Sequence, residues 1–146
     1  MIMKFIRTLI KVFNGKLLPT DKEIFEFVYK EYYDEFINFD RNNNKTRETK
    51  NFIPIDIGKI ANNFGVDKDI IFSRFYYYFK EKYDYKKDIG GDVHFFLKSS
   101  GDEMHVVHFP YLTSILAEMR YNDEKFHISI WISIFAVVIA FLSFIF

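Results

Sequence analysis

The sequence predicts an α+β protein in which a small domain of helices and a β-hairpin is followed by a single transmembrane helix. The transmembrane helix is predicted by residues 128–146, a run without charge, proline or glycine. The hairpin is predicted by apolar residues on both sides of a Ser100-Gly101-Asp102 turn. Apolar residues at helical spacing predict the helices. The chain therefore divides into an amphipathic basic helix (1–14), a cytosolic domain (20–121) and a transmembrane helix (126–146).

Length and composition exclude several classes of protein. The chain has 146 residues, enough for one domain of modest size. Twenty basic residues balance 20 acidic ones, which excludes a generally basic nucleic-acid-coating protein. The absence of cysteine excludes disulfide scaffolds, thiolate zinc sites and cysteine nucleophiles. The aromatic residues, 19 Phe and 10 Tyr, accompany an excess of Ile, Lys and Asn, so we assign them to an ordinary core.

The first 14 residues, MIMKFIRTLIKVFN, predict an amphipathic helix. Basic residues interrupt the apolar run that a signal peptide needs. They would contact anionic headgroups if the helix lies on the membrane surface. They would face solvent if the apolar half packs on the protein's own domain. The polar half comprises Lys4, Arg7, Thr8, Lys11 and Asn14, and the apolar half comprises Ile2, Phe5, Ile6, Leu9, Ile10, Val12 and Phe13.

The domain is predicted to begin with a helix. Thr20 and Glu23 form the capping-box pattern at its start, and its apolar stripe continues to about Phe39. A polar loop follows at residues 40–51. Residues 52–55 then form a short strand, which we expect at the edge of a sheet because it contains a proline.

Two further helices are predicted in residues 56–85. Asp56 and Asp67 are suited to cap them, and Gly65 lies at the turn between them, where a positive φ is needed. The hairpin comes next. Pro110 then opens another helix, with a single apolar stripe formed by Leu112, Ile115, Leu116 and Met119.

Residues 56–109 resemble the helix-turn-helix and wing of winged-helix domains. The resemblance depends on apolar and small residues at the expected positions, namely Ile60, Ala61, Phe64, Gly65, Val66 and Ile71. Arg74 departs from the pattern, since another apolar residue is usual there, and the adjacent Phe75 can substitute for it. The resemblance implies a winged-helix-like fold in the order helix, edge strand, helix pair, hairpin and helix, and a function in binding nucleic acid or protein.

The second helix of the pair and the polar loop carry the candidate contacts with a partner. Residues 67–88 contain six basic and five acidic residues, so this surface is nearly neutral and favours a protein at least as much as DNA. The alternative is that both regions are simply solvated. The candidate contacts are Lys68, Ser73, Arg74 and Tyr77 on the helix and Arg41, Lys45 and Arg47 in the loop.

Neither catalysis nor metal binding is predicted. The sequence has no Gly-rich phosphate loop and no GxSxG motif, and Gly90-Gly91 is most simply a turn. His94, His105 and His108 lie near the hairpin without the HExxH or HxH spacing of metal ligands. We therefore expect a non-enzymatic protein without metal or cofactor.

Residues 128–146 extend about 28 Å as a helix, close to the roughly 30 Å thickness of the hydrocarbon layer. Arg120 and Lys125 precede this span, so the positive-inside rule predicts a cytoplasmic domain, with a bacterial inner membrane as the expected location. Hydroxyl groups in the span can bond to the helix's own carbonyls. They belong to three serines that share one polar face, Ser129, Ser133 and Ser143.

The sequence leaves two functions open. In the first, a membrane-anchored recognition protein binds a protein or nucleic acid at the inner face of the membrane. In the second, the chain is a membrane-perturbing effector of the toxin or anti-phage defence type. Its transmembrane helices would then assemble into a homo-oligomer through the serine face and permeabilise the bilayer when the domain is triggered.

Overall fold

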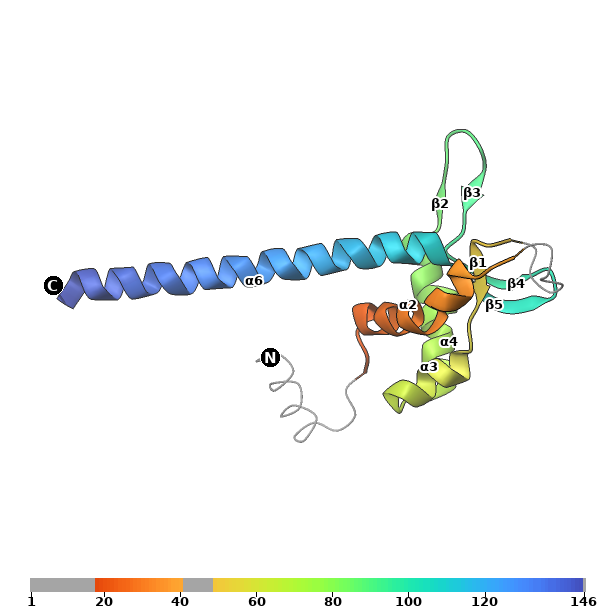
Figure 1. Cartoon of the computed structure of the whole chain (residues 1–146), viewed down its shortest axis with the longest axis horizontal. Coiled ribbons are helices and arrows are strands. Elements are labelled where there is room, and N and C mark those ends of the chain that lie inside the picture. Colours follow the sequence, from red (N-terminus) through yellow and green to blue (C-terminus); the bar gives the residue numbers. More distant parts are fainter. Residues whose placement is uncertain (1–17, 41–48, 146) are drawn as a thin grey trace. The chain divides into compact units, whose positions relative to one another are not determined.

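The computed structural model describes residues 18–40 and 49–145, which form a mixed α+β domain and a long C-terminal helix (Figure 1). This confirms the predicted α+β class and the long apolar C-terminal helix. The described residues fall into two compact units, and the division between them lies between Thr113 and Ser114, inside the last helix. The predicted amphipathic helix at residues 1–14 lies outside the described residues.

Helix α2 (Asp21–Ile37) begins at the predicted capping box. Thr20 Oγ1 accepts a hydrogen bond from Glu23 N at 3.3 Å, and the Glu23 carboxylate accepts one from Thr20 N at 2.8 Å. These reciprocal bonds satisfy two amide groups that a helix N-terminus leaves without an intrahelical partner. The side chains that α2 buries are Ile24, Phe25, Val28 and Tyr32.

A three-stranded antiparallel sheet has the order β1-β5-β4. Ile53 of β1 pairs with Val107 of β5, and β5 continues the hairpin with β4. Ile55 N donates to His105 O at 3.0 Å, so the neighbouring Pro54 nitrogen faces away from β5 and its missing N–H costs no sheet bond. The strands are β1 (Phe52–Pro54), β4 (Phe96–Ser100) and β5 (Glu103–His108).

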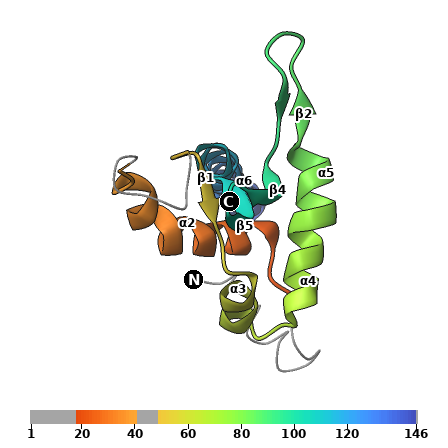
Figure 2. The ribbon, with the colours of Figure 1, turned by 90° about the vertical axis from the view of Figure 1, so that its right-hand side faces the viewer.

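Two helical runs lie between β1 and β4. Asp56 caps the first run through Lys59 N at 2.9 Å, and Asp67 caps the second through Asp69 N at 2.8 Å. Gly65 ends the first run with φ 64°, the conformation predicted at this turn. The first run is α3 (Ile57–Phe64). The second is a continuous rod formed by α4 (Lys68–Ser73), the π-helical segment η1 (Arg74–Phe79) and α5 (Lys80–Tyr83) (Figure 2).

A second, short hairpin separates α5 from β4. Its strands, β2 (Tyr85–Lys86) and β3 (Asp92–Val93), pair antiparallel. Gly90 and Gly91 lie in its loop with φ 104° and 90°, so the predicted turn is present. It connects β2 and β3, which form a separate two-stranded ribbon. The ribbon extends away from the helices in Figure 2. The sequence did not predict this ribbon, because strands of two residues are too short to show an alternation of apolar and polar residues.

Aromatic side chains form the centre of the domain, as predicted for this composition. Phe25 lies 4.8 Å from Phe79 and 5.4 Å from Phe95, measured between ring centroids, and Phe75 lies 5.1 Å from Phe79. All four rings have no exposed surface. Burying one such side chain contributes about 1.5–3 kcal/mol, so α2 and η1 are held together mainly by this cluster.

Helix α6 (Phe109–Ile145) runs for 37 residues without a break. The helix predicted to open at Pro110 and the span predicted from residue 126 both lie within it. They form one helix because no proline or glycine follows Pro110 in the sequence to end it. Residues 117–127 of the second unit thus supply about 17 Å of mostly polar helix before the apolar run begins.

Candidate functional site

The rod from α4 to α5 presents one buried side and one exposed side. Ile71, Phe75 and Phe79 follow one another at intervals of four residues, and none of the three is exposed. In an α-helix each such interval overshoots one turn by about 40°, which would rotate the third side chain off the core. The wider π-helical turn of η1 reduces this drift. Phe75 therefore takes the core position, as expected, and Arg74 is displaced from it.

Three of the four predicted contacts on this rod are exposed, namely Lys68, Ser73 and Tyr77. The Tyr77 side chain is 64% exposed. Ile70, which is not among the predicted contacts, is also exposed, at 40%. Ile70, Ser73 and Tyr77 lie at intervals of three and four residues, which places them on one side of a helix. The same spacing in the sequence would have indicated Ile70, had the exposed side of the rod been known.

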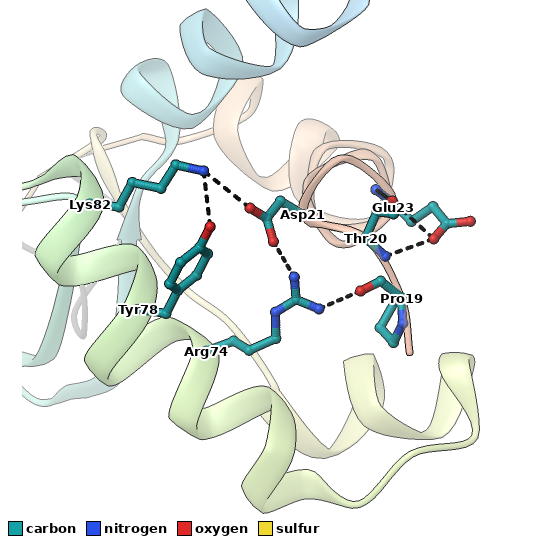
Figure 3. Close-up of polar contacts among 7 residues, drawn as sticks. All are labelled: Pro19, Thr20, Asp21, Glu23, Arg74, Tyr78 and Lys82. Atoms are coloured by element: carbon teal, nitrogen blue, oxygen red, sulfur yellow. Dashed lines mark hydrogen bonds and ion pairs between the residues drawn. The ribbon is translucent and has the colours of Figure 1, made fainter. Parts of the chain in front are cut away.

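Arg74, the fourth predicted contact, is engaged within the domain. Its guanidinium donates hydrogen bonds to the Asp21 carboxylate and to the Pro19 carbonyl (Figure 3). It also lies over the Phe79 ring, 5.5 Å from the centroid. The side chains of Arg74 and Asp21 are only 22% and 17% exposed. Arg74 therefore joins the start of α2 to the rod, and its charge is compensated there.

Lys82 extends the same polar cluster. Its Nζ lies 3.3 Å from Asp21 Oδ2 and 3.2 Å from the Tyr78 hydroxyl (Figure 3). Burial alone lowers the pKa of Lys82, but hydrogen bonds with Tyr78, Tyr83 and Asp21 outweigh that effect and raise it. Asp21 thus compensates two cations of the rod, which reduces the positive charge offered to an external phosphate.

The loop residues Arg41, Lys45 and Arg47 and the N-terminal residues Lys4, Arg7 and Lys11 all lie outside the described residues.

The three candidate histidines have separate surroundings. His94 Nδ1 lies 2.9 Å from Asp84 Oδ2. His108 Nδ1 accepts a hydrogen bond from Tyr111 N at 3.2 Å, and burial lowers the pKa of His108. His105 has φ 55° and lies against the rings of Phe72 and Phe96. Within residues 18–40 and 49–145, no group of three or more His, Asp or Glu side chains is arranged to hold a metal ion.

Asp84 is the centre of a second polar cluster, where α5 ends. Its carboxylate accepts hydrogen bonds from Phe95 N at 2.7 Å and Lys80 Nζ at 2.8 Å, in addition to the contact with His94. Burial alone raises the pKa of Asp84, yet these hydrogen bonds outweigh it and hold the pKa below its ordinary value. The cluster fixes the direction in which β4 leaves the second hairpin.

The second unit contains the membrane candidate. Of the helices in the described part of the chain, α6 alone is long and apolar enough to cross a bilayer. The hydroxyl of each of the three serines donates a hydrogen bond of 2.9 Å to the carbonyl oxygen four residues earlier, as predicted. The two alanines of the span lie on the serine side, so all five positions fall within about 80° of the helix circumference at 100° per residue. We name this the small-residue face: Ser129, Ser133, Ala136, Ala140 and Ser143.

Comparison with protein-family models finds no match for this chain, and comparisons with curated proteins and with solved structures find none either. The function is therefore inferred from the geometry above.

Proposed function

We propose that this chain is a membrane-anchored recognition protein without catalytic activity, whose winged-helix-like domain binds a protein partner at the cytoplasmic face of a bacterial inner membrane. The order of α2, β1, α3, the α4–α5 rod, the β4–β5 hairpin and α6 supports the winged-helix part. Pairing of β1 with β5 also joins the strand before the helix pair to the hairpin after it. The β2–β3 ribbon is an addition to that order.

The anchoring part of the proposal is supported by the apolar run of α6, whose side chains are exposed throughout residues 128–144. A surface that is apolar on every side is stable in lipid and costly in water. Arg120 and Lys125 precede the run and favour a cytoplasmic domain.

The choice of a protein partner depends on one observation: the rod exposes Ile70 and Tyr77 while Arg74 is paired with Asp21. DNA binding derives most of its non-specific affinity from basic side chains that neutralise phosphates. Protein interfaces instead concentrate binding energy in aromatic side chains such as tyrosine. The exposed side of the rod, with an uncharged isoleucine and tyrosine, is more typical of a protein interface.

Site-specific photocrosslinking tests this proposal. A benzophenone amino acid replaces Tyr77 in the full chain expressed in a bacterial cell, and a matched variant carries it at Tyr85, an exposed tyrosine of β2. We expect one discrete protein adduct from position 77 that is absent from position 85 and is lost when Ile70→Asp is added. The absence of a position-specific adduct at 77 would contradict the proposal.

A second measurement, on the purified full chain, distinguishes a nucleic acid partner. Binding of a fluorescent 20-base-pair duplex to the full chain in nanodiscs is measured across a salt series. If DNA were the partner, the affinity would fall steeply with salt, and Lys68→Ala would reduce the slope by about one. We expect no salt-dependent binding above that of empty nanodiscs.

The small-residue face supports a second candidate, the membrane-perturbing effector. Small side chains let transmembrane helices approach closely, and five of them share this side of the span. In this candidate function, copies of the chain oligomerise through that face and open the bilayer when the domain is triggered.

Dye uptake distinguishes the two candidates. Cells expressing the full chain, a truncation after Lys125, or a Ser133→Leu/Ala136→Leu variant are exposed to propidium iodide at matched protein levels. An effector admits the dye only as the full chain, and the leucine variant blocks uptake. An anchor leaves all three populations impermeable, and the leucine variant stays in the membrane fraction.

A further inference from the structure

Residues 85–92 of the β2–β3 ribbon form an exposed segment of the domain. All eight of these residues are exposed, and the Ile89 side chain at the tip is 91% exposed. The ribbon extends away from the neighbouring helices (Figure 2). Lys86 and Lys87 are adjacent and precede the tip. Exposed loop tips are preferred sites of proteolysis, so the ribbon offers two positions to a protease that cleaves after lysine.

Few interactions hold the ribbon closed. Its strands pair over two residues each, and the loop adds a hydrogen bond from Lys87 N to Gly91 O at 3.3 Å. The Tyr85 ring lies 5.8 Å from the Tyr111 ring, measured between centroids. An isolated two-stranded hairpin is marginally stable in water. Opening the ribbon into an extended segment therefore costs little free energy compared with unfolding the domain.

The base of the ribbon is fixed. The Asp84 carboxylate, before β2, accepts a hydrogen bond from Phe95 N, after β3, at 2.7 Å. The Tyr111 hydroxyl donates to the Tyr83 carbonyl oxygen at 3.0 Å. Local opening is therefore confined to residues 85–93. When extended, this segment reaches roughly 30 Å, so it can enter the active-site cleft of a protease while the helices stay folded.

Contacts elsewhere in the domain join the part of the chain before the ribbon to the part after it. The Phe95 ring lies 5.4 Å from Phe25 and 5.2 Å from Tyr83, measured between centroids. Phe96 lies 5.6 Å from Phe75, and β1 pairs with β5. The four phenylalanines have no exposed surface. These contacts do not involve the ribbon, so they persist when a peptide bond within it is broken.

We propose that the ribbon is a proteolytic cleavage site, at which a protease that cleaves after lysine divides the chain without dismantling the domain. Hydrolysis breaks the amide bond between Lys87 and Asp88. The hydroxyl of one water molecule joins the Lys87 carbonyl carbon, and the remaining hydrogen of that water joins the Asp88 nitrogen. The new carboxyl group then transfers its proton to the new amine.

Cleavage places the α4–α5 rod and the apolar run of α6 on separate chains, which only the core of the domain holds together. Because the proposed function assigns partner binding to the rod and anchoring to α6, the recognition surface is then no longer joined covalently to the membrane. This consequence rests on the proposed function, whereas the cleavage itself does not.

Limited trypsin digestion of the full chain in detergent micelles tests the proposal. Intact-mass spectrometry follows the initial rate at which C-terminal fragments beginning after Lys86 or Lys87 form. The matched comparison is the fragment that begins after Lys98, which is also an exposed lysine but lies in β4 of the three-stranded sheet. The double variant Lys86→Gln/Lys87→Gln removes both positions in the ribbon, and Lys98→Gln removes the comparison position.

We expect cleavage in the ribbon to be at least about a hundredfold faster than cleavage after Lys98, because the ribbon opens locally whereas β4 opens only with the sheet. It should be absent from the double variant and unchanged in Lys98→Gln. The two fragments should elute together in size-exclusion chromatography until urea is added. Equal initial rates at the two positions would overturn the inference, since cleavage would then require unfolding, and so would separation of the fragments without urea. The micelles contain no partner, so the outcome is independent of the photocrosslinking result.

Discussion

Replacing Arg74 by glutamine should destabilise the domain by about 2 kcal/mol. Removing one partner of a fully buried ion pair costs about 3–5 kcal/mol, whereas an exposed pair contributes about 0–1 kcal/mol. Arg74 and Asp21 lie between these limits, with 22% and 17% of their side chains exposed. The substitution also removes the donor to the Pro19 carbonyl. Lys82 stays beside Asp21 and limits the loss.

The free energy of unfolding can be measured in the full chain in detergent micelles. Val28→Cys introduces a single buried thiol, which is alkylated only when the domain unfolds. With a urea dependence of about 2 kcal/mol per molar, a loss of about 2 kcal/mol lowers the unfolding midpoint by about 1 M. The apolar part of α6 does not contribute to this signal, because the thiol lies in α2.

A double-mutant cycle isolates the pair. Asp21→Asn alone should cost at least as much as Arg74→Gln, because it leaves both Arg74 and Lys82 without their carboxylate, and the double variant should be less destabilised than the sum of the two by about 1 kcal/mol. Strict additivity, or a loss below about 0.5 kcal/mol for Arg74→Gln, would refute the view that this pair holds α2 on the rod.

Three further predictions use the same preparations. Tyr32→Phe removes the hydroxyl that accepts from Asp56 N at 2.7 Å, and should lower the urea midpoint by the equivalent of about 1–2 kcal/mol; an unchanged midpoint would show that this bond contributes nothing. The pKa of Asp84 is lowered because its hydrogen bonds outweigh the opposing effect of burial, so its contribution is complete above the ordinary value of 3.8 and is lost as the pH falls through the lowered pKa. Asp84→Asn should therefore reduce stability at pH 6 and flatten the decline below pH 4, whereas parallel profiles would disprove the assignment. Ile134→Lys combined with Val138→Lys places two charges in the span at a cost of about 5–7 kcal/mol and should shift the chain from the membrane fraction to the soluble fraction. Full retention in the membrane would contradict the assigned span.

Features that depend on a few neighbouring residues could be predicted from the sequence. The capping box needs only Thr20 and Glu23, and the left-handed turn needs only Gly65, so both follow from local chemistry. Pro54 indicated an edge strand for a similarly local reason. The uncharged run of residues 128–146 needs no tertiary information at all.

Features that depend on distant residues could not be predicted. Arg74 contacts Asp21 across 53 positions of sequence, and a polar residue on a helix gives no sign of such a partner. The substitution of Phe75 for Arg74 in the core was expected from the sequence, but no propensity scale anticipates the π-helical turn that accompanies it. For the candidate site, Lys68, Ser73 and Tyr77 were found as exposed residues, whereas Ile70 was missed because an isoleucine on an amphipathic helix is usually assigned to the core.

Because α6 is uninterrupted, the directions in which its side chains point are fixed relative to one another around one helix axis. Leu116, which is buried, and Ser129, which begins the small-residue face, belong to the same unit and are separated by 13 residues. At 100° per residue their directions differ by about 140°. One residue inserted in the polar stretch 117–127 would rotate the small-residue face by about 100° relative to Leu116, whereas seven would restore its bearing to within about 20°. The number of residues in this stretch therefore sets the direction, around the helix axis, in which the span presents its serines relative to Leu116.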